Sequence, residues 1–393
     1  MAQLSGWPWN VGALPFYYTP LRRPTNDDLP DYLPFALDTD YRTGALVQVP
    51  NKEVSDALSQ AYSKGSMPTG MMDEEGIGKE YAEDFLAFLQ RRVDKCLKRA
   101  TVLEIGCGTG YLLYRLKLLG ADVLGLEPGP HGQDGSKRFG IPIIKDFFPS
   151  PKIAGQFDLV VLFSVLEHME SPSEFLGSVL PLLKEDGRIA ISVPDCEPYV
   201  ETGDISMLYS EHWGYYTHTT LRNSVKTSMG LETEVEKASF GGTLCALGKG
   251  RASRQTISES ELDAERRRAN NYRILARKGI GRLLGYLKDA AAKGESVGIY
   301  VPGRAVNALS IIREEIDLEG IRFFDDNQLL RGTYVPGFNI PIEPRERLIE
   351  KPTDRILIMS RSFGKRIAKH LTSLTIEREF TITTWEELFP GQS

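Results

Sequence analysis

The 393-residue chain has few cysteines and histidines and no long apolar run. Its four cysteines, Cys96, Cys107, Cys196 and Cys245, form no C-x-x-C pair, so we expect neither a zinc knuckle nor a disulfide framework. No apolar stretch approaches the length of a membrane span, and the first residues lack the charged and apolar regions of a secretory signal. We therefore expect a protein of the reducing cytoplasm.

The chain also lacks a large excess of charge of one sign. Its formal net charge is −6, and 25% of the residues are charged while 41% are hydrophobic. These values are typical of a soluble globular protein. They give no excess of positive charge with which the chain would bind nucleic acid or an anionic membrane. The sequence leaves the oligomeric state open. At this length two or three domains are expected.

The most informative stretch is residues 101–110, TVLEIGCGTG, which combines a buried-strand pattern with three glycines at alternate positions. Glycine lacks a Cβ, so the chain can turn sharply and a ligand can lie against bare backbone. A helical pattern follows at 111–119, and a second strand at 122–126 ends at Glu127. An acid in this position can accept hydrogen bonds from both hydroxyls of a ribose. The stretch predicts a nucleotide-type binding corner.

Two classes of cofactor use such a corner. The dinucleotide fingerprint G-x-G-x-x-G needs glycine at the position of Tyr111, which argues against NAD and FAD. The pattern G-x-G-x-G after an acid resembles the first motif of class I S-adenosylmethionine (SAM) methyltransferases. The other interpretation of the same residues is a tight turn in a generic α/β domain.

Strands and helices alternate through the following region, which indicates a doubly wound parallel sheet. Strands are expected at 141–144, 157–163 and 188–193, and helices near 131–138 and at 172–183. In such a sheet the ligand lies outside the carboxyl ends of the strands. The candidate residues at those ends are Glu104–Gly110, Glu127, Asp146 and Leu166–His168.

Four short motifs in this region, V-L-E-I-G-C-G-T-G, L-E-P, K-D-F and V-L-E-H, resemble those of the SAM methyltransferase superfamily in the same order. The resemblance implies SAM as the cofactor and assigns a part of it to each motif. The methionine part would contact Glu104, Gly106, Cys107, Gly108 and Gly110. The ribose would contact Glu127 and Pro128, and the adenine would contact Asp146 and Phe147. The floor of the cofactor site would be lined by Leu166, Glu167 and His168.

The segment 199–220, YVETGDISMLYSEHWGYYTHTT, follows the fifth strand and is less regular. Tyr209, Tyr215 and Tyr216 surround the pair Glu211-His212. A loop in this position can fold over the cofactor as a lid or a substrate wall. A surface loop whose aromatic residues pack on the domain is the other interpretation.

The ends of the chain differ from this central part. Residues 1–35 are rich in proline and aromatic residues, which blocks regular helix and indicates an ordered arm. A β-hairpin is expected at 36–50, a short helix at 52–64, a flexible connector at 65–78 and an amphipathic helix near 79–98.

A second α/β unit is expected after a polar linker at 250–256 and a long helix at 258–292. Its strands are predicted at 297–301, 321–324, 355–359 and 379–383, with helices at 305–316 and up to about residue 372. Gly303 lies at a strand-to-helix turn, where either an anion site or a plain structural glycine is possible. Gly303, Arg304 and Asn307 are the candidate acceptor residues of this unit, in addition to Tyr215 and Tyr216.

The order of parts resembles the three-part sugar C-methyltransferases, in which a zinc-binding N-terminal domain precedes a SAM domain and a C-terminal Rossmann-like domain. The run D-x-N-x-x-x-x-G-x-Y-x-P-G-x-x-I-P-I from Asp325 to Ile342 has that family's spacing, and Tyr209-Ser210-Glu211-His212 resembles its Y-H-E-H signature. The hairpin Gly44–Gln48 and Tyr62 are also family-like, and Tyr62 is assigned to the cofactor site. The expected parts are 1–78, a small β region; 79–252, a class I methyltransferase sheet; and 253–393, a smaller Rossmann-like domain.

The chain departs from that family at three places. No cysteine precedes Cys96, so we expect the N-terminal zinc site to be absent, and no other metal ligand is predicted. Ser210 replaces the first histidine of the signature, and Arg361-Ser362 stand where the family has Trp-Asn. The last two departures leave the identity of the acceptor open.

The leading hypothesis is a SAM-dependent enzyme that methylates a carbon of a nucleotide-linked keto-sugar or a related small polar metabolite. By resemblance His212 would be the base, assisted by Tyr209 and Glu211. O- or N-methylation of another metabolite is the nearest alternative. A non-catalytic protein that binds SAM or a nucleotide sugar is a third, and the intact Gly106, Gly108, Gly110 and Glu127 argue against a degenerate binder.

Overall fold

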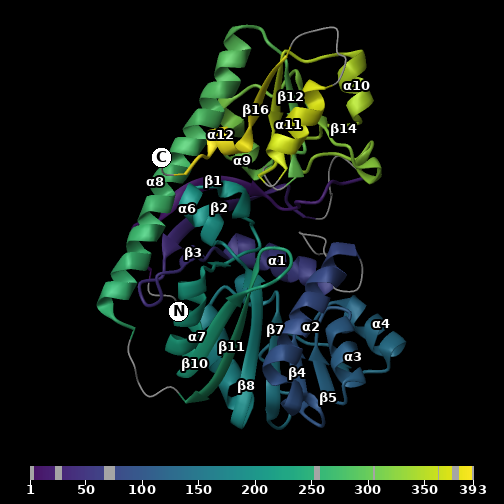
Figure 1. The fold of residues 1–393 in the computed structure, drawn as a ribbon, viewed down its shortest axis with the longest axis vertical. Coiled ribbons are helices and arrows are strands. Elements are labelled where there is room, and N and C mark those ends of the chain that lie inside the picture. Colours follow the sequence, from purple (N-terminus) through teal and green to yellow (C-terminus); the bar gives the residue numbers. More distant parts are fainter. Residues whose placement is uncertain are drawn as a thin grey trace. The chain divides into compact units, whose positions relative to one another are not determined.

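The structure is a computed structural model that describes residues 4–22, 29–65, 76–251, 257–303, 306–361, 363–373 and 380–391. The chain divides into two compact units (Figure 1). The first contains the residues up to Trp9, Ala36–Glu197 and Glu211–Ala269; the second contains Asn10–Phe35, Pro198–Ser210 and the residues from Asn270 onward. In the described ranges no helix has both the length and the apolar character needed to span a bilayer.

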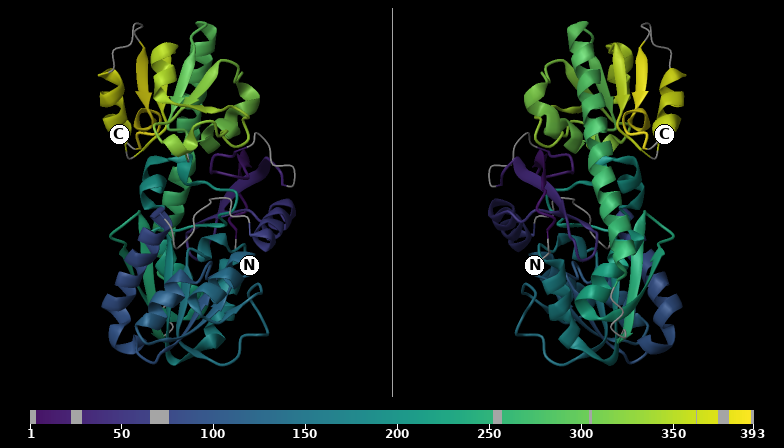
Figure 2. Two further views of the ribbon diagram at one scale, coloured as in Figure 1. Left: turned by 90° about the vertical axis from the view of Figure 1, so that its right-hand side faces the viewer. Right: turned by 90° about the vertical axis from the view of Figure 1, so that its left-hand side faces the viewer.

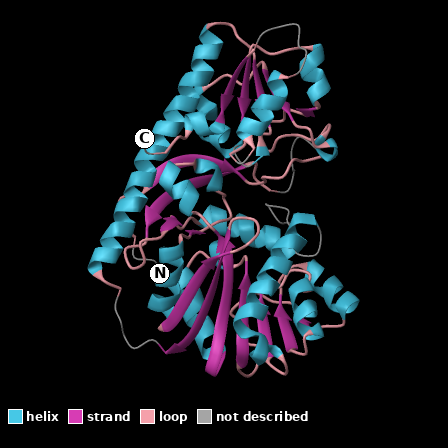
Figure 3. Ribbon diagram, viewed as in Figure 1, coloured by secondary structure: helices cyan, strands magenta, loops and turns pink. Residues whose placement is uncertain are grey.

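A seven-stranded sheet forms the centre of the first unit (Figure 3). Its strands are β4 (Thr101–Ile105), β5 (Asp122–Leu126), β6 (Ile143–Ile144), β7 (Phe157–Phe163), β8 (Leu183–Pro194), β10 (Leu231–Lys237) and β11 (Thr243–Arg251). The order is β10-β11-β8-β7-β4-β5-β6, and β11 alone runs antiparallel to its neighbours β8 and β10 while the other pairs are parallel. The chain runs outward from β4 through β5 to β6 and then crosses back to β7 on the other side of β4. This reversal makes a switch point between β4 and β7, and the expected doubly wound class I methyltransferase sheet is confirmed.

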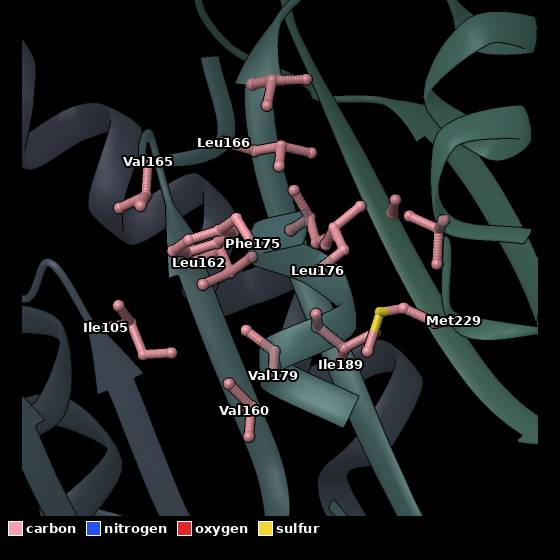
Figure 4. Packing of buried hydrophobic residues seen from close by; sticks show 14 of the residues in the cluster. Ile105, Val160, Leu162, Val165, Leu166, Phe175, Leu176, Val179, Ile189 and Met229 are labelled. Carbon is pink, nitrogen blue, oxygen red and sulfur yellow. The ribbon is translucent and has the colours of Figure 1, made fainter. Parts of the chain in front are cut away.

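Helices cover both faces of this sheet. The strands carry apolar residues on both faces, and both sets of side chains are buried against helices. Along β7, Leu159 and Val161 pack with apolar residues of α2 (Gly76–Leu97) and α3 (Tyr111–Leu118). The alternating residues Val160 and Leu162 pack instead with α5 (Pro172–Val179) and α7 (His218–Met229). The period of two along each strand produces two separate apolar cores. Figure 4 shows the second core, in which Val160 lies near Val179 of α5.

A separate four-stranded sheet has the order β1-β2-β3-β9. The predicted hairpin is confirmed, since β2 (Tyr32–Thr39) and β3 (Leu46–Gln48) pair antiparallel with Thr39 opposite Leu46. Helix α1 (Lys52–Lys64) follows, capped by Asn51, whose side chain accepts from the Glu53 backbone N–H. The connector expected at 65–78 falls mostly outside the described residues.

The segment predicted to be irregular, 199–220, contains short regular elements. They are the end of α6 (Glu197–Thr202), a 3-10 helix (Ile205–Met207), and strand β9 (Gly214–Tyr215), which pairs with β3. Helix α7 begins after Thr217, which forms a capping box with Thr220. Elements of two or three residues carry too little periodicity to be predicted, and here tertiary pairing defines them.

The second unit contains a parallel sheet with the order β14-β13-β12-β15-β16. Its strands are β12 (Val297–Tyr300), β13 (Ile321–Phe324), β14 (Ile342–Glu343), β15 (Arg355–Ile358) and β16 (Thr381–Thr384), and its helices are α9 (Val306–Ile312), α10 (Arg345–Glu350), α11 (Gly364–Thr372) and α12 (Trp385–Leu388). This confirms the smaller Rossmann-like sheet, although α9 ends four residues earlier than predicted. Figure 2 shows α8 (Glu259–Ala292) as one continuous helix, as its periodicity indicated.

The described parts of the N-terminal arm are ordered, as expected. Strand β1 (Trp9–Pro15) forms in this arm although it contains a proline. Pro15 is tolerated because it lies at the end of the strand, and β1 is an edge strand of its sheet. Further along, Leu21 forms an isolated β-bridge with Tyr334. The hydroxyl of Tyr32 donates to the Gly337 carbonyl, and the Arg313 guanidinium lies 3.8 Å from the centre of the Tyr32 ring. All of these contacts lie within the second unit.

Leu176 tests the second core. Its side chain is fully buried among the strands, so Leu176→Ala should lower the free energy of unfolding by about 2–5 kcal/mol through lost burial and the cavity left behind. Denaturant unfolding measures this loss. Leu180→Ala, at a position that is 37% exposed, is the matched control and should change the free energy by about 0.5 kcal/mol or less. Equal losses for the two variants would contradict the assigned packing.

Candidate active site

The Gly-rich turn joins β4 to α3 with three glycines in the left-handed region. Gly106, Gly108 and Gly110 have φ values of 70°, 53° and 77°. A Cβ on Gly106 would lie 2.7 Å from Val165 Cγ2, so both backbone conformation and space require glycine there. Gly110 is the N-cap of α3. The turn therefore presents bare backbone at the carboxyl end of the sheet, as the sequence predicted.

Glu127 links this turn to the end of β5. Its carboxylate accepts from the Gly108 N–H at 3.0 Å and from the Gly129 N–H at 2.8 Å. His131, one helical turn further on, places Nε2 3.3 Å from Glu127 Oε1. Glu127 is 8% exposed, and a carboxylate has about four acceptor positions, so capacity remains for the hydroxyls of a ribose. His131 was not predicted from the sequence, although its spacing of four residues from Glu127 could have indicated the contact.

Asp146 and Phe147 follow β6, as predicted. The Asp146 carboxylate accepts from the Phe147 N–H and the Ser150 hydroxyl, and Lys152 lies 3.1 Å away. The bond from Ser150, and then the bond and charge of Lys152, hold the pKa of Asp146 below its usual value. Asp146 is therefore an ionised acceptor, and the Phe147 ring beside it is 46% exposed and free to stack on a flat ligand.

Leu166–His168 form a single 3-10 turn at the end of β7. The preceding Ser164 has a φ of 54°, which a residue other than glycine seldom adopts. The turn is held from two sides: Ser164 N–H donates to Ser192 O of β8, and Trp213 N–H donates to Glu167 O. The second bond ties the Glu211–His212 segment to this turn.

A polar cluster joins residues from three distant parts of the sequence within the first unit. The hydroxyl of Tyr62, on α1, donates to Glu211 Oε2 at 3.0 Å and lies 3.3 Å from His168 Nδ1. The same Nδ1 is 3.2 Å from the Glu211 carbonyl oxygen. The rings of His168 and His212 meet edge to face at 4.8 Å between centroids. Tyr62, His168, Glu211 and His212, which were predicted separately, therefore form one group.

Burial changes the acid–base properties of this cluster. It raises the pKa of Glu167, which is 2% exposed, to about 7; the Glu211 carboxylate adds to the effect and His168 opposes it. Burial and the Glu211 carboxylate together raise the pKa of Tyr62 well above its ordinary value. Tyr62 is therefore a hydrogen-bond donor at neutral pH, and Glu167 can hold a proton there.

Three predicted acceptor residues are buried. Tyr216 is 1% exposed and packs in the apolar core of the sheet, and its hydroxyl has no hydrogen-bond partner among the described residues. Asn307 is fully buried, and its amide donates to the carbonyls of Ile205 and Leu208, which makes it an anchor for that segment. Tyr215 is equally buried, with its ring 6.2 Å from that of His212. Gly303 is exposed, and Arg304 lies outside the described residues.

Two departures from the sugar C-methyltransferase pattern have partners within the second unit. Ser210 donates its hydroxyl to Pro15 O and its backbone N–H to the Tyr18 hydroxyl, and Tyr209 packs edge to face on Tyr18 at 4.3 Å. The N-terminal arm thus holds the residues directly before Glu211-His212. Tyr209, in that arm contact, is 6% exposed.

Arg361 has a similar structural role. Its guanidinium donates to Asp204 Oδ2 and to the Pro198 carbonyl, each from the segment after β8. Asp204 is almost fully buried and also accepts from the Trp385 indole N–H at 2.9 Å. Arg361 therefore anchors the second unit to its own 198–204 segment.

The structure also brings together three side chains that the sequence did not connect, in a chain for which no metal ligand was predicted. One atom each of Glu167, His168 and His212 lies within 4.8 Å of the others, a grouping that could hold a cation. The sequence did not show it because His212 is 44 residues away from His168. Only the contact between the two segments brings the three side chains together.

Comparisons with known proteins agree with this geometry. Residues 77–235 match the family model described as a methyltransferase domain. The chain carries a methyltransferase domain. Behind it, residues 249–382 match the model described as a C-methyltransferase C-terminal domain.

Among curated proteins, the methyltransferase domain is similar to ubiquinone biosynthesis O-methyltransferases. The protein from Marinobacter nauticus is 29% identical over 123 residues, which are 29% of this chain and 51% of that protein. The mitochondrial protein from Schizosaccharomyces pombe is 29% identical over 110 residues, 26% of this chain and 40% of that protein. The chain thus spans about half the length of these curated relatives.

Among solved structures, the Burkholderia thailandensis 1,6-didemethyltoxoflavin-N1-methyltransferase with S-adenosylhomocysteine is similar with a TM-score of 0.40 and 15% identity, over 55% of this chain and 96% of that one.

The protonation of Glu167 in the methyltransferase domain can be tested through stability. Because its folded pKa of about 7 exceeds the ordinary 4.5, the folded protein binds more protons between these values, and the free energy of unfolding falls as the pH rises through this range. Glu167→Gln removes this loss. Relative to wild type, the variant should gain on the order of 1–3 kcal/mol between about pH 5 and about pH 8, measured by urea unfolding.

The matched control is Glu185→Gln, at an exposed position of β8. Its difference from wild type should not change with pH. If both variants shift alike, Glu167 is ionised in the folded protein at neutral pH.

Proposed function

We propose that the protein is a SAM-dependent methyltransferase that transfers a methyl group to a carbon of a keto-sugar, most simply one linked to a nucleotide. The observation that carries the choice of carbon is the match of residues 249–382 to a C-methyltransferase C-terminal domain directly behind a methyltransferase domain. The run Asp325–Ile342 and the sequence Glu211-His212 support the sugar through the resemblance given above.

The residues at the carboxyl end of the sheet fit SAM. The Gly-rich turn lies at the carboxyl end of the sheet with its glycines in the left-handed region, and Glu127 retains acceptor positions beside its two backbone donors. When bound, SAM supplies an electrophilic methyl group. Glu127 would hold the ribose, Asp146 and Phe147 the adenine, and the turn from Glu104 to Gly110 the methionine part.

Methylation beside a ketone requires removal of a proton from carbon. His212 is the proposed base, because a neutral imidazole accepts a proton near neutral pH and the side chain lies in the cluster with Glu167 and His168. Tyr62 keeps its proton and is hydrogen-bonded to Glu211, so it can donate to a developing enolate oxygen after a small movement. Transfer then needs only that the enolate carbon is held in line with the methyl group.

The acceptor contacts are proposed from the resemblance to the sugar C-methyltransferases and from the glycine turn at Gly303. The proposed acceptor contacts are Tyr215, Tyr216, Gly303, Arg304 and Asn307, while Tyr209 and Glu211 are proposed to assist the base. We also propose the three-part division 1–78, 79–252 and 253–393, which the bounds of the two family models support.

O-methylation is the second candidate, because the curated proteins similar to the methyltransferase domain are named as O-methyltransferases. A hydroxyl group is a stronger acid than a ketone's α-carbon, so this reaction makes a weaker demand on a base. Incubation with SAM and a panel of nucleotide-linked keto-sugars and phenolic metabolites, followed by mass spectrometry and assignment of the methylated atom, separates the two reactions. Methylation of oxygen only would overturn the carbon assignment.

Glu127→Ala tests the cofactor. Loss of the ribose acceptor should weaken SAM binding by on the order of 1–3 kcal/mol, measured by calorimetry. Glu185→Ala, at an exposed position of β8, should bind SAM as the wild type does. Tight binding of NAD by the wild type, together with no binding of SAM, would refute this cofactor.

His212→Ala tests the base. The variant should keep the SAM affinity of wild type but lower the rate of methyl transfer by roughly 10²–10⁴. It should also stop exchanging the α-proton of the acceptor with deuterated water when SAM is absent, an exchange that the wild type should perform. His370→Ala, at an exposed position on α11, is the matched control and should leave both readouts unchanged. Undiminished turnover in His212→Ala would exclude this base.

A further inference from the structure

Glu167, His168 and His212 are the residues that, within the described part of the chain, could share a metal ion. Glu167 and His168 come from the 3-10 turn after β7, and the edge-to-face ring contact brings His212 against His168. Two imidazoles and one carboxylate form a common ligand set of catalytic zinc sites, in which a fourth position stays open. The proposed function uses only His212 of these three as an acid–base group.

The hydrogen bonds of His168 fix the direction of its lone pair. Nδ1 is 3.2 Å from the Glu211 carbonyl oxygen, which can only accept. The Tyr62 hydroxyl is also near Nδ1, but its proton is already donated to Glu211 Oε2. The network therefore places the proton of a neutral His168 on Nδ1 and leaves the Nε2 lone pair available. A histidine ligand that donates its other N–H to a backbone carbonyl is the usual arrangement around metals.

On the other side of the ring, His168 Nε2 faces a carboxylate that is not bonded to it. Glu167 Oε1 lies 4.0 Å away, beyond hydrogen-bonding distance. Glu167 is 2% exposed, and its Oε2 has no hydrogen-bond partner among the described residues. The same holds for Oε1 of Glu211, which is also 2% exposed. Buried oxygens of carboxylates require a partner, which can be a proton or a cation.

We propose that Glu167, His168 and His212 bind one Zn²⁺ ion, and that this ion inhibits the enzyme. Zinc bonds to nitrogen and oxygen are about 2.0–2.2 Å long, so the three ligand atoms need to approach one another by roughly an ångström. The imidazole nitrogens select zinc over Mg²⁺ and Ca²⁺, which prefer oxygen ligands. The inhibition rests on the proposed function, because a lone pair of His212 that is bound to zinc cannot accept a proton from the acceptor.

Binding is measured first, without SAM or acceptor, so that it does not depend on the reaction. Full-length protein freed of metal with a chelator is titrated with ZnCl₂, and separately with MgCl₂, by calorimetry. We expect one zinc ion per chain and no binding of magnesium. Glu167→Gln removes the anionic ligand and should weaken zinc binding at least about tenfold. Glu185→Gln and His370→Ala, at exposed positions, are matched controls and should bind zinc like the wild type.

The second measurement is methyl transfer with increasing zinc. Turnover of the wild type should fall as the site fills, and EDTA should restore it. Glu167→Gln should need at least about ten times more zinc for the same inhibition. No zinc binding by the wild type, or binding that Glu167→Gln leaves unchanged, would overturn the site. Zinc binding that raises turnover would overturn the inhibitory role and the assignment of His212 as the base, whereas absence of any turnover would refute only the proposed function.

Discussion

The carboxylate of Glu127 determines the shape of the cofactor corner, because it accepts backbone N–H groups from two segments at once. Gly108 donates from the turn after β4, and Gly129 donates from the N-cap of helix α4 (Pro130–Phe139). The glycines of α4 allow this close approach: a Cβ on Gly132 would lie 2.7 Å from Glu127 Cγ, and one on Gly135 would lie 1.8 Å from Thr109 O. The glycines of the turn and of α4 therefore allow both segments to pack closely against each other and against Glu127.

A second constraint is the burial of two acids beside two histidines. Glu167 and Glu211 are both 2% exposed and each has an oxygen without a hydrogen-bond partner in the described part of the chain. Ordinary packing would replace such groups with apolar residues, since unpaired buried charge destabilises a fold. Their position at the carboxyl end of the sheet, close in sequence to the left-handed Ser164, supports the proposals of proton transfer and cation binding made above.

The departures from the sugar C-methyltransferase pattern now have a physical explanation. Ser210 bonds to the N-terminal arm through Pro15 and Tyr18, and Arg361 bonds to the 198–204 segment through Asp204. Both residues stabilise the second unit. The arm that the resemblance left without a counterpart is thus connected by chain continuity to Glu211-His212. Ser210 and Arg361 hold two parts of the backbone that precedes this pair, at residue 210 and at residues 198–204.

The sequence by itself determined the elements whose pattern is local. Alternating strands and helices, the glycine turn at 106–110 and the acid at Glu127 follow from period, spacing and the special conformations of glycine, and the structure confirmed the sheet they predicted. Tertiary structure decided what depends on contacts between distant segments. It buried Tyr216 and Asn307 and formed the two-residue strand β9. It also brought one cluster together, which consists of Tyr62, His168, Glu211 and His212. Local patterns carry no information about which side chains meet across 40 or more residues, since packing and hydrogen-bond satisfaction of the whole unit select those pairs.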